Sequence, residues 1–193
     1  MVLRLKKGLR AFGVAESFLK EMPRSNLAGV VMRADLIIDG FSFGYATVGG
    51  DDATERIAEM YEKLNRNDVN LIMLDGVVIS EFNIIDVDAL YRRTRRPVIA
   101  LTFEESEGLE EHIKRKFPSS WLRKLESYYR LGGRERVRLK TGFEVFVRVA
   151  GIDLKLAKKC LDMFTVQGGI PEPIKVAKLL ARAKLRHELE SNF

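Results

Sequence analysis

Residues 9–48, LRAFGVAESFLKEMPRSNLAGVVMRADLIIDGFSFGYATV, contain three β-rich runs in succession. The first two runs are short and apolar, and the third alternates small, aromatic and β-branched residues, a pattern typical of strands. The link between the second and third runs is too short to contain a helix, so we predict an antiparallel meander. The three predicted strands cover residues 9–14, 27–32 and 36–48.

Helices and strands alternate after this meander. Asp52 and Glu55 stand in the spacing of a capping box, which predicts that a helix starts at Asp52 and continues to Leu64. The segment VNLIML at 69–74 is a continuous apolar run typical of a strand buried on both faces. Further predicted elements are a helix at 84–93, a strand at 97–102, charged helices at about 105–116 and 119–130, a hairpin of 137–139 and 143–149, a helix at 154–164, and a last helix from Pro171-Glu172-Pro173 towards Leu189.

This order of elements predicts an α/β fold of ribonuclease-H-like architecture. Three antiparallel strands followed by two strands that helices connect give a mixed five-stranded sheet flanked by helices, to which the late hairpin is added. With 193 residues, of which 46% are hydrophobic and 31% are charged, the chain is expected to be a single domain spanning residues 1–193. This composition excludes a disordered chain or a fibre.

Composition also limits the location of the protein and the kind of metal site. No window approaches the ~18–20 apolar residues of a membrane helix, and the basic N-terminus lacks the apolar run of a secretory signal, so a cytoplasmic protein is expected. The single cysteine, Cys160, and the two histidines, His112 and His187, exclude an internal disulfide and Cys-rich or His-rich metal sites. A metal site must then be built from carboxylates, which suits Mg²⁺ or Mn²⁺.

The net charge of +6 hides two oppositely charged blocks. Residues 35–90 contain 12 acids and 3 bases, a balance of −9, whereas residues 114–148 contain 11 bases and 3 acids, a balance of +8. An acidic block for cations and a basic block for phosphates favour a metal-dependent enzyme that acts on nucleic acid, although two solvated surfaces are the alternative. The predicted nucleic-acid-binding residues are Arg92, Arg93, Arg95, Arg96, Arg134, Arg136, Arg138 and Lys140, with Trp121, Tyr128 and Tyr129 as candidates for stacking on bases.

Five carboxylates are candidates for the chemistry. Asp75 ends an apolar run and precedes a glycine, so it is expected at the carboxyl edge of the sheet, where α/β proteins usually bind ligands. Glu16 follows the first strand and is expected beside Asp75. Asp51 and Asp52 begin the first helix and Glu172 begins the last, where capping or the helix dipole is the alternative explanation.

Four features extend over nearly the whole chain: GVAE at 13–16, the meander, LDG at 74–76, and the late hairpin followed by GGIPEP at 168–173. Together they resemble an uncharacterised, mainly archaeal family related to endonuclease V. The resemblance implies a ribonuclease-H-like fold and cleavage of nucleic acid beside deaminated adenine (inosine) with Mg²⁺ or Mn²⁺. It also implies that Asp75 is the aspartate of a Val-Asp-Gly motif and that Asp51 or Asp52 is the acid at the start of the first helix.

Three features depart from the endonuclease V pattern, and one of them is Leu-Asp-Gly-Val-Val at 74–78 in place of Val-Asp-Gly-His-Gly. Ala15 stands where the first-strand aspartate belongs, and Glu16 lies one step later, facing the other way in an extended strand. The late histidine is absent, and Glu172 is the nearest acid.

Two hypotheses on function therefore stand. The first is a metal-dependent nuclease for DNA or RNA, in which Asp75, Glu16 and Glu172 are catalytic and Asp75, Glu16, Asp51 and Asp52 hold the metal. The second is a non-catalytic nucleic-acid-binding or regulatory protein that kept the fold and lost the full metal site.

Overall fold

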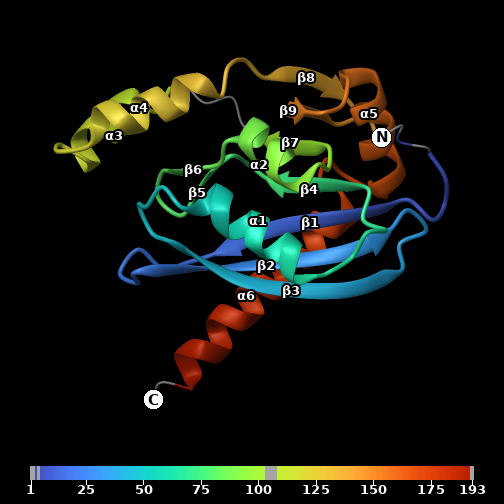
Figure 1. Ribbon diagram of the computed structural model, residues 1–193, viewed down its shortest axis with the longest axis horizontal. Coiled ribbons are helices and arrows are strands. Elements are labelled where there is room, and N and C mark those ends of the chain that lie inside the picture. Colours follow the sequence, from blue (N-terminus) through green and yellow to red (C-terminus); the bar gives the residue numbers. More distant parts are fainter. Residues whose placement is uncertain (1–2, 4, 103–107, 192–193) are drawn as a thin grey trace.

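The computed structural model describes residues 3, 5–102 and 108–191 and contains a seven-stranded mixed sheet with the strand order β3-β2-β1-β4-β7-β9-β8 (Figure 1). A separate pair of short strands, β5 and β6, follows β4 along the chain. The strands are β1 (Arg10–Ser17), β2 (Arg24–Arg33), β3 (Ile38–Thr47), β4 (Leu71–Asp75), β5 (Val78–Ile79), β6 (Asn83–Ile84), β7 (Val98–Thr102), β8 (Glu135–Arg138) and β9 (Glu144–Ala150).

The strand directions confirm the predicted architecture. The meander β1–β2–β3 is antiparallel, and β1, β4 and β7 are parallel neighbours. The predicted late hairpin, β8–β9, joins the same sheet because β9 pairs antiparallel with β7, which extends the five strands to seven. The apolar residues of β4 and β7 are buried, as expected for parallel strands that helices cover on both faces.

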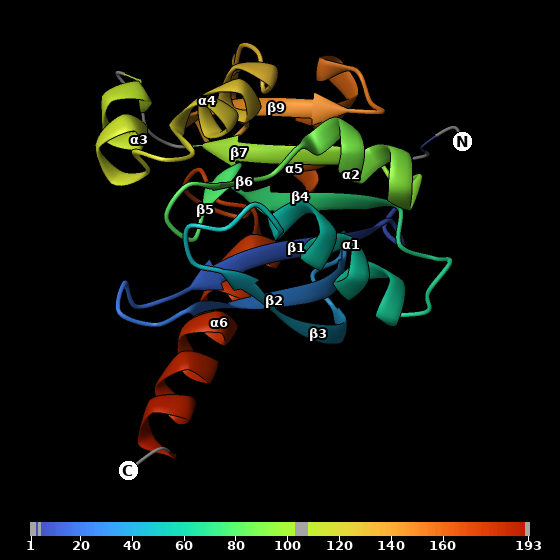
Figure 2. The ribbon, with the colours of Figure 1, turned by 60° about the vertical axis from the view of Figure 1, so that its left-hand side comes forward.

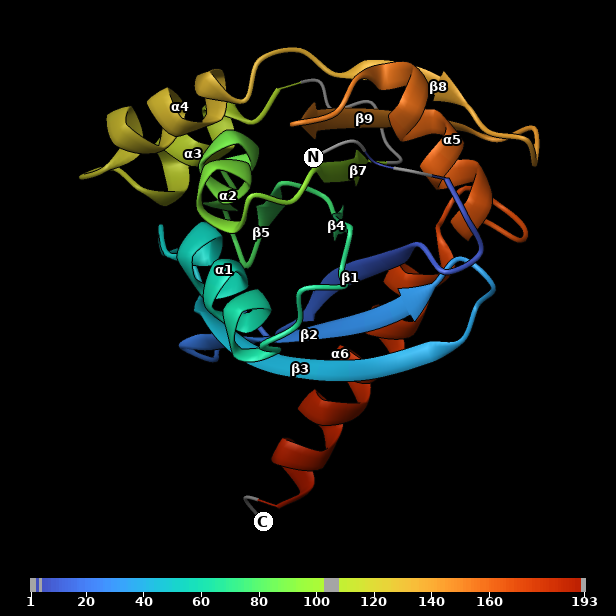
Figure 3. The same ribbon diagram turned by 45° about the vertical axis from the view of Figure 1, so that its right-hand side comes forward.

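Helices cover both faces of the sheet (Figure 3). On one face, α1 (Ala53–Lys63) and α2 (Val87–Thr94) bury apolar residues against Phe12, Val14 and Leu74. On the other face, α5 (Leu154–Phe164) packs against Met73 and Ile99. The remaining helices are α3 (Glu110–Lys116), α4 (Trp121–Arg130) and α6 (Glu172–Glu190), and residues 105–107 of the predicted helix at 105–116 lie outside the described residues. Among the described helices, none is both long and apolar enough to cross a membrane.

Five strands, β1, β3, β4, β7 and β8, end at one edge of the sheet, which we call the strand-end edge. The parallel strands β1, β4 and β7 end there, and β3 ends there too, because it runs antiparallel to β2 (Figure 2). Side chains of successive residues in a strand point to opposite faces. Val14 therefore packs in the core under α1 and α2, whereas Ala15 packs on the opposite face with Ala177 of α6.

Helix α6 lies directly on β1. A Cβ atom added to Gly13 would lie 2.5 Å from the carbonyl carbon of Pro173, so only glycine at this position allows the first turn of α6 to approach the strand this closely. Ile174, Ala177 and Ala181 follow at helical spacing and are fully buried. The small side chains of α6 and β1 thus set the position of the helix over the strand ends.

We predict that Gly13→Ala lowers the free energy of unfolding by about 1–3 kcal/mol, because the added methyl group forces Pro173 away from β1. Denaturant unfolding of the variant and the parent measures the difference. Gly133→Ala is the matched control, since a Cβ atom there meets nothing within 4 Å. Equal stability of the two variants would contradict the close approach of α6.

Candidate functional site

Asp75 lies where the apolar pattern predicts it, at the last position of β4 on the strand-end edge. Its carboxylate Oδ2 is 2.9 Å from the ammonium nitrogen of Lys178, which α6 presents from the face that Ala15 also occupies. The side chains of Asp75 and Lys178 are 16% and 30% exposed, so the pair is partly desolvated but open to a ligand. The site therefore contains a cation of the protein itself beside its central carboxylate.

Glu16 lies at the end of β1 and is committed to hydrogen bonds with serines. Its carboxylate accepts from Ser25 Oγ at 2.6 Å, from the backbone N–H of Ser80 at 2.7 Å, and from Ser80 Oγ. Strand alternation places Glu16 on the face opposite Ala15, as predicted for an extended strand. Glu16 and Asp75 nevertheless line one recess of about 10 Å³ at the strand ends, roughly the space that one water molecule needs.

The turn that Glu16 holds is strained. Ser80, Glu81 and Phe82 connect β5 to β6 with φ values of 44°, 56° and 66°, a left-handed conformation that residues other than glycine rarely adopt in succession. Lys116 pairs with Glu81 at 2.7 Å, and the buried Lys124 donates to the carbonyl oxygen of Phe82 at 3.0 Å. Strained turns that their surroundings hold in place are common beside functional sites. This turn could not be predicted from the sequence, because the residues that hold it are distant along the chain.

Asp51 and Asp52 have partners of their own away from Asp75. Asp51 forms ion pairs with Arg123 and with Lys124 of α4. Asp52 accepts from the backbone and hydroxyl of Thr47 and, at 2.7 Å, from Asn83 Nδ2. Burial acts to raise the pKa of Asp52, but these hydrogen bonds outweigh it and hold the pKa below its usual value.

The predicted capping box at the start of α1 is wrong. The side chain of Asp52 makes no capping hydrogen bond with the helix. The backbone N–H of Ala53 instead donates to Asn83 Oδ1 at 2.9 Å. Asn83 belongs to β6, an element that local spacing cannot reveal. The side chain of Asp52 is turned towards Thr47 at the end of β3.

Glu172 pairs with Lys175 one turn along α6, with 2.5 Å between the charged atoms. The residue of α6 that reaches Asp75 is Lys178. Lys178 was not predicted, because only acids and histidines were expected beside Asp75. The signal was nevertheless present, since Lys178 lies one turn after the buried Ile174 and so on the same side of the last helix.

The described carboxylates form no preassembled metal centre. No group of three or more His, Cys, Asp or Glu side chains within residues 3, 5–102 and 108–191 is arranged to hold a metal ion. The two carboxylates that line the recess, Asp75 and Glu16, are oxygen donors of the kind that Mg²⁺ and Mn²⁺ take. One or two carboxylates are enough for Mg²⁺ when water and a substrate phosphate complete the coordination. The arrangement does not fit a two-ion centre built from the four predicted metal-binding acids.

The structure divides the predicted basic residues into two groups. Arg92, Arg93, Arg95 and Arg96 lie at the end of α2, where β7 begins, which is the end of the sheet opposite to Asp75. Arg93 pairs there with Glu55 at 2.9 Å and with Glu62 at 2.8 Å, and Arg96 donates to Tyr61. These contacts connect α1 with α2 and with the start of β7.

The second basic group lies beside Asp75. Arg134 and Arg136 stack on the ring of Phe146, 5.2 and 5.4 Å from its centroid. A pocket of about 110 Å³ joins Gly76, which follows Asp75, to Arg134, Arg148 and the predicted stacking residue Tyr128. Burial lowers the pKa of Arg148, and the neighbouring Arg134 acts in the same direction, so this pocket is a poorly solvated concentration of positive charge. Arg138 and Lys140 are exposed further along the same hairpin.

Comparisons with known proteins agree on one family. A family model described as endonuclease dU matches residues 7–185. A UPF0215 protein of Pyrobaculum aerophilum is 38% identical over 170 residues, which cover 88% of this chain and 91% of that protein.

Solved structures share the fold at low sequence identity. A protein of unknown function from Archaeoglobus fulgidus has a TM-score of 0.78 at 22% identity and covers 91% of this chain and 97% of its own. Endonuclease V of Ciona intestinalis, solved with a 24mer DNA containing an inosine followed by a ribo-adenosine, has a TM-score of 0.60 at 18% identity, covering 93% and 86% of the two chains. The predicted ribonuclease-H-like architecture is confirmed.

We predict that Glu16→Ala loosens the turn at 80–82, because the backbone N–H and the hydroxyl of Ser80 both lose their acceptor. Hydrogen–deuterium exchange should then accelerate at residues 78–84 while exchange in β4 stays slow. Glu21→Ala, at an exposed loop position, is the control. Unchanged exchange at the Ser80 amide would show that Glu16 does not hold the turn.

Proposed function

Since the chain belongs to the endonuclease dU family, an archaeal family related to endonuclease V, we propose that it is a nuclease that cleaves phosphodiester bonds of DNA or RNA. The position of Asp75 carries this proposal. A carboxylate at the end of β4 lies between the ammonium of Lys178 and the arginine pocket that begins at Gly76. A phosphodiester is anionic. It can contact both the ammonium of Lys178 and the arginine pocket only by lying across the strand-end edge.

The residues of this chain supply binding and orientation. The guanidinium of Arg148 donates to the carbonyl oxygens of Leu131 and Gly132, both at 3.1 Å, and its remaining N–H groups are left for a ligand. Arg148 and Arg134 would bind phosphate oxygens by charge-assisted hydrogen bonds, which are strongest where water is excluded. The ammonium group of Lys178 would leave its ion pair with Asp75 and pair with an incoming phosphate. Lysine can make this exchange because its charge is compact and its side chain is flexible. Asp75 is thereby released as the phosphate arrives.

Asp75 and Glu16 are the residues that would hold a single Mg²⁺ or Mn²⁺. Such an ion supplies a water of lowered pKa and stabilises charge on the leaving oxygen. Glu16 must release Ser25 or Ser80 to take part, and this links the site to the strained turn. Glu172, Asp51 and Asp52 have no place in this arrangement unless they leave their present partners.

A second candidate function is a nucleic-acid-binding protein without catalysis. Two observations favour it: Ala15 leaves the Asp75 face of β1 without a ligand, and Lys178 already neutralises the Asp75 charge. In this protein the strand-end edge binds the phosphate backbone and leaves it intact.

We predict that Asp75→Asn abolishes cleavage and Mn²⁺ binding while the fold is kept, because the substitution removes one charge with little change of shape. Cleavage is measured on inosine-containing and undamaged DNA and RNA, single-stranded and duplex, with each metal, and Mn²⁺ binding by calorimetry. Lys178→Met removes the cation that competes for Asp75, so its Mn²⁺ affinity should rise above that of the parent. Asp88→Asn, at an exposed position of α2, is the matched control.

The outcomes separate the two functions. Cleavage by Asp75→Asn at the rate of the parent contradicts the nuclease proposal. The non-catalytic function is supported if the parent protein binds nucleic acid but neither cleaves it nor binds Mn²⁺. In that case the Lys178→Met variant should bind no Mn²⁺ either.

A further inference from the structure

Strand β3 presents a row of exposed aromatic side chains that the proposed cleavage site does not use. Phe41, Phe43 and Tyr45 alternate along the strand and are 50%, 44% and 41% exposed. Side chains two residues apart in a strand share a face, so the three rings form one platform. The strand is at the edge of the sheet, with β2 as its neighbour on one side. Large exposed apolar surfaces of this kind mark binding sites.

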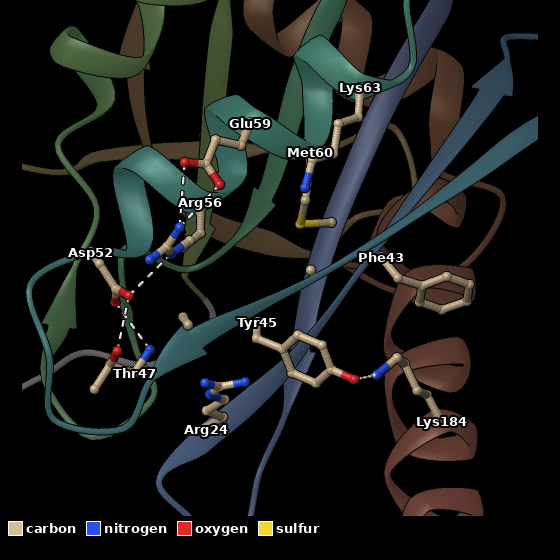
Figure 4. Close-up of a pocket in the computed structure, with 12 residues that line it drawn as sticks. Arg24, Phe43, Tyr45, Thr47, Asp52, Arg56, Glu59, Met60, Lys63 and Lys184 are labelled. Atoms are coloured by element: carbon tan, nitrogen blue, oxygen red, sulfur yellow. Dashed lines mark hydrogen bonds and ion pairs between the residues drawn. The ribbon is translucent and has the colours of Figure 1, made fainter.

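A pocket of about 550 Å³ lies at the carboxyl end of this row, between β3, α1 and α6 (Figure 4). Met60, which is buried, lies on its floor. Four cations line it: Arg24, Arg56, Lys63 and Lys184. Its two acids, Asp52 and Glu59, both pair with Arg56, at 3.3 and 3.2 Å.

Two of these cations remain available for a ligand. The side chains of Arg24 and Lys63 are exposed and have no hydrogen bond or ion pair with any residue that the structure describes. Lys184 is different, because its ammonium is 2.7 Å from the hydroxyl of Tyr45 and 3.9 Å from the ring centroid. The pocket thus combines an aromatic surface with unpaired positive charge.

This combination favours nucleic acid over a second copy of the chain. Two such edges brought together would place the unpaired cations of both copies in one interface, where like charges repel. Bases stack on aromatic rings and phosphates pair with cations, which is how proteins bind single strands without reading their sequence. In a duplex the bases are paired and stacked, so a ring of β3 could not reach their faces.

One end of the pocket, at Thr47 and Asp52, lies on the strand-end edge, as Asp75 does. Tyr45 and Thr47 are at the end of β3, and β3 is three strand spacings from β4, or about 14 Å. Only a few nucleotides are needed to extend from Asp75 to Tyr45.

We propose that the platform of Phe43 and Tyr45 binds an unpaired stretch of nucleic acid next to the phosphodiester at Asp75, with bases stacked on the rings and phosphates on Arg24 and Lys63. This inference rests on the proposed function in taking nucleic acid as the partner. It adds a binding site outside the arginine pocket and assigns it single-stranded DNA or RNA.

The test is fluorescence anisotropy with labelled single-stranded and duplex oligonucleotides of DNA and of RNA. Tyr45→Ala and Phe43→Ala should each weaken single-strand binding about five- to 100-fold, the usual effect of losing one stacked base. Tyr45→Phe keeps the ring and should keep the affinity. Arg24→Ala and Lys63→Ala should each reduce the slope of log K against log salt by about 0.7. Phe143→Ala, at an exposed ring in the β8–β9 turn, is the matched control and should bind like the parent.

Three results would overturn the inference. They are equal affinities of Tyr45→Ala and Phe143→Ala, absence of single-strand binding by the parent, and a dimer of the parent that Phe43→Ala dissociates. The anisotropy readout is independent of cleavage. If the parent protein never cleaves nucleic acid but Tyr45→Ala weakens its single-strand binding, the nuclease proposal is contradicted and this inference is supported. If Tyr45→Ala cleaves nucleic acid with an unchanged KM, only the single-strand binding inference is contradicted.

Discussion

The close contact between α6 and β1 is the constraint on which the candidate site depends. Gly13 allows Pro173 to lie against the strand, and Ala15 and Ala177 continue the contact along both elements. A larger side chain at any of these positions would lift the helix. Because α6 is held this close, Lys178 reaches Asp75 and, further along the helix, Lys184 reaches Tyr45. One helix therefore places a cation at each of the two proposed nucleic-acid contacts.

The fold was largely predictable because its signals are local. Continuous apolar runs marked the buried strands β4 and β7, and the short link at 33–35 required a meander. The resemblance to an archaeal family related to endonuclease V was carried by motifs such as LDG at 74–76, and the family match over residues 7–185 confirms it. The short strands β5 and β6 escaped because Glu16 and Lys124, both distant in sequence, hold the turn between them.

The candidate site was less predictable because ion pairs and side-chain hydrogen bonds form between residues that are close in the folded structure but distant in sequence. Asp75 is placed by the strand that it ends, so its position followed from pattern alone. Asp51, Asp52 and Glu172 were expected to gather around a metal, but each has a nearer donor or cation in Lys124, Asn83 or Lys175. Lys178 is the opposite case, a partner that was not expected. The buried face of α6 could be predicted from residue spacing, but the contact of Lys178 with Asp75 depends on the angle at which α6 crosses the sheet.

The order in which the chain is synthesised gives the position of α6 a further consequence. The first two strands emerge from the ribosome long before the helix that covers them, as the hydrogen bond between Asn26 and Glu188 over 162 positions illustrates. Until then the face that contains Ala15, Val30 and Met32 has no cover, and exposed apolar surface of this kind promotes aggregation of folding intermediates. A nascent chain that stalls before Pro171 would leave this face exposed, because the helix that covers it is the last element of the chain to be synthesised.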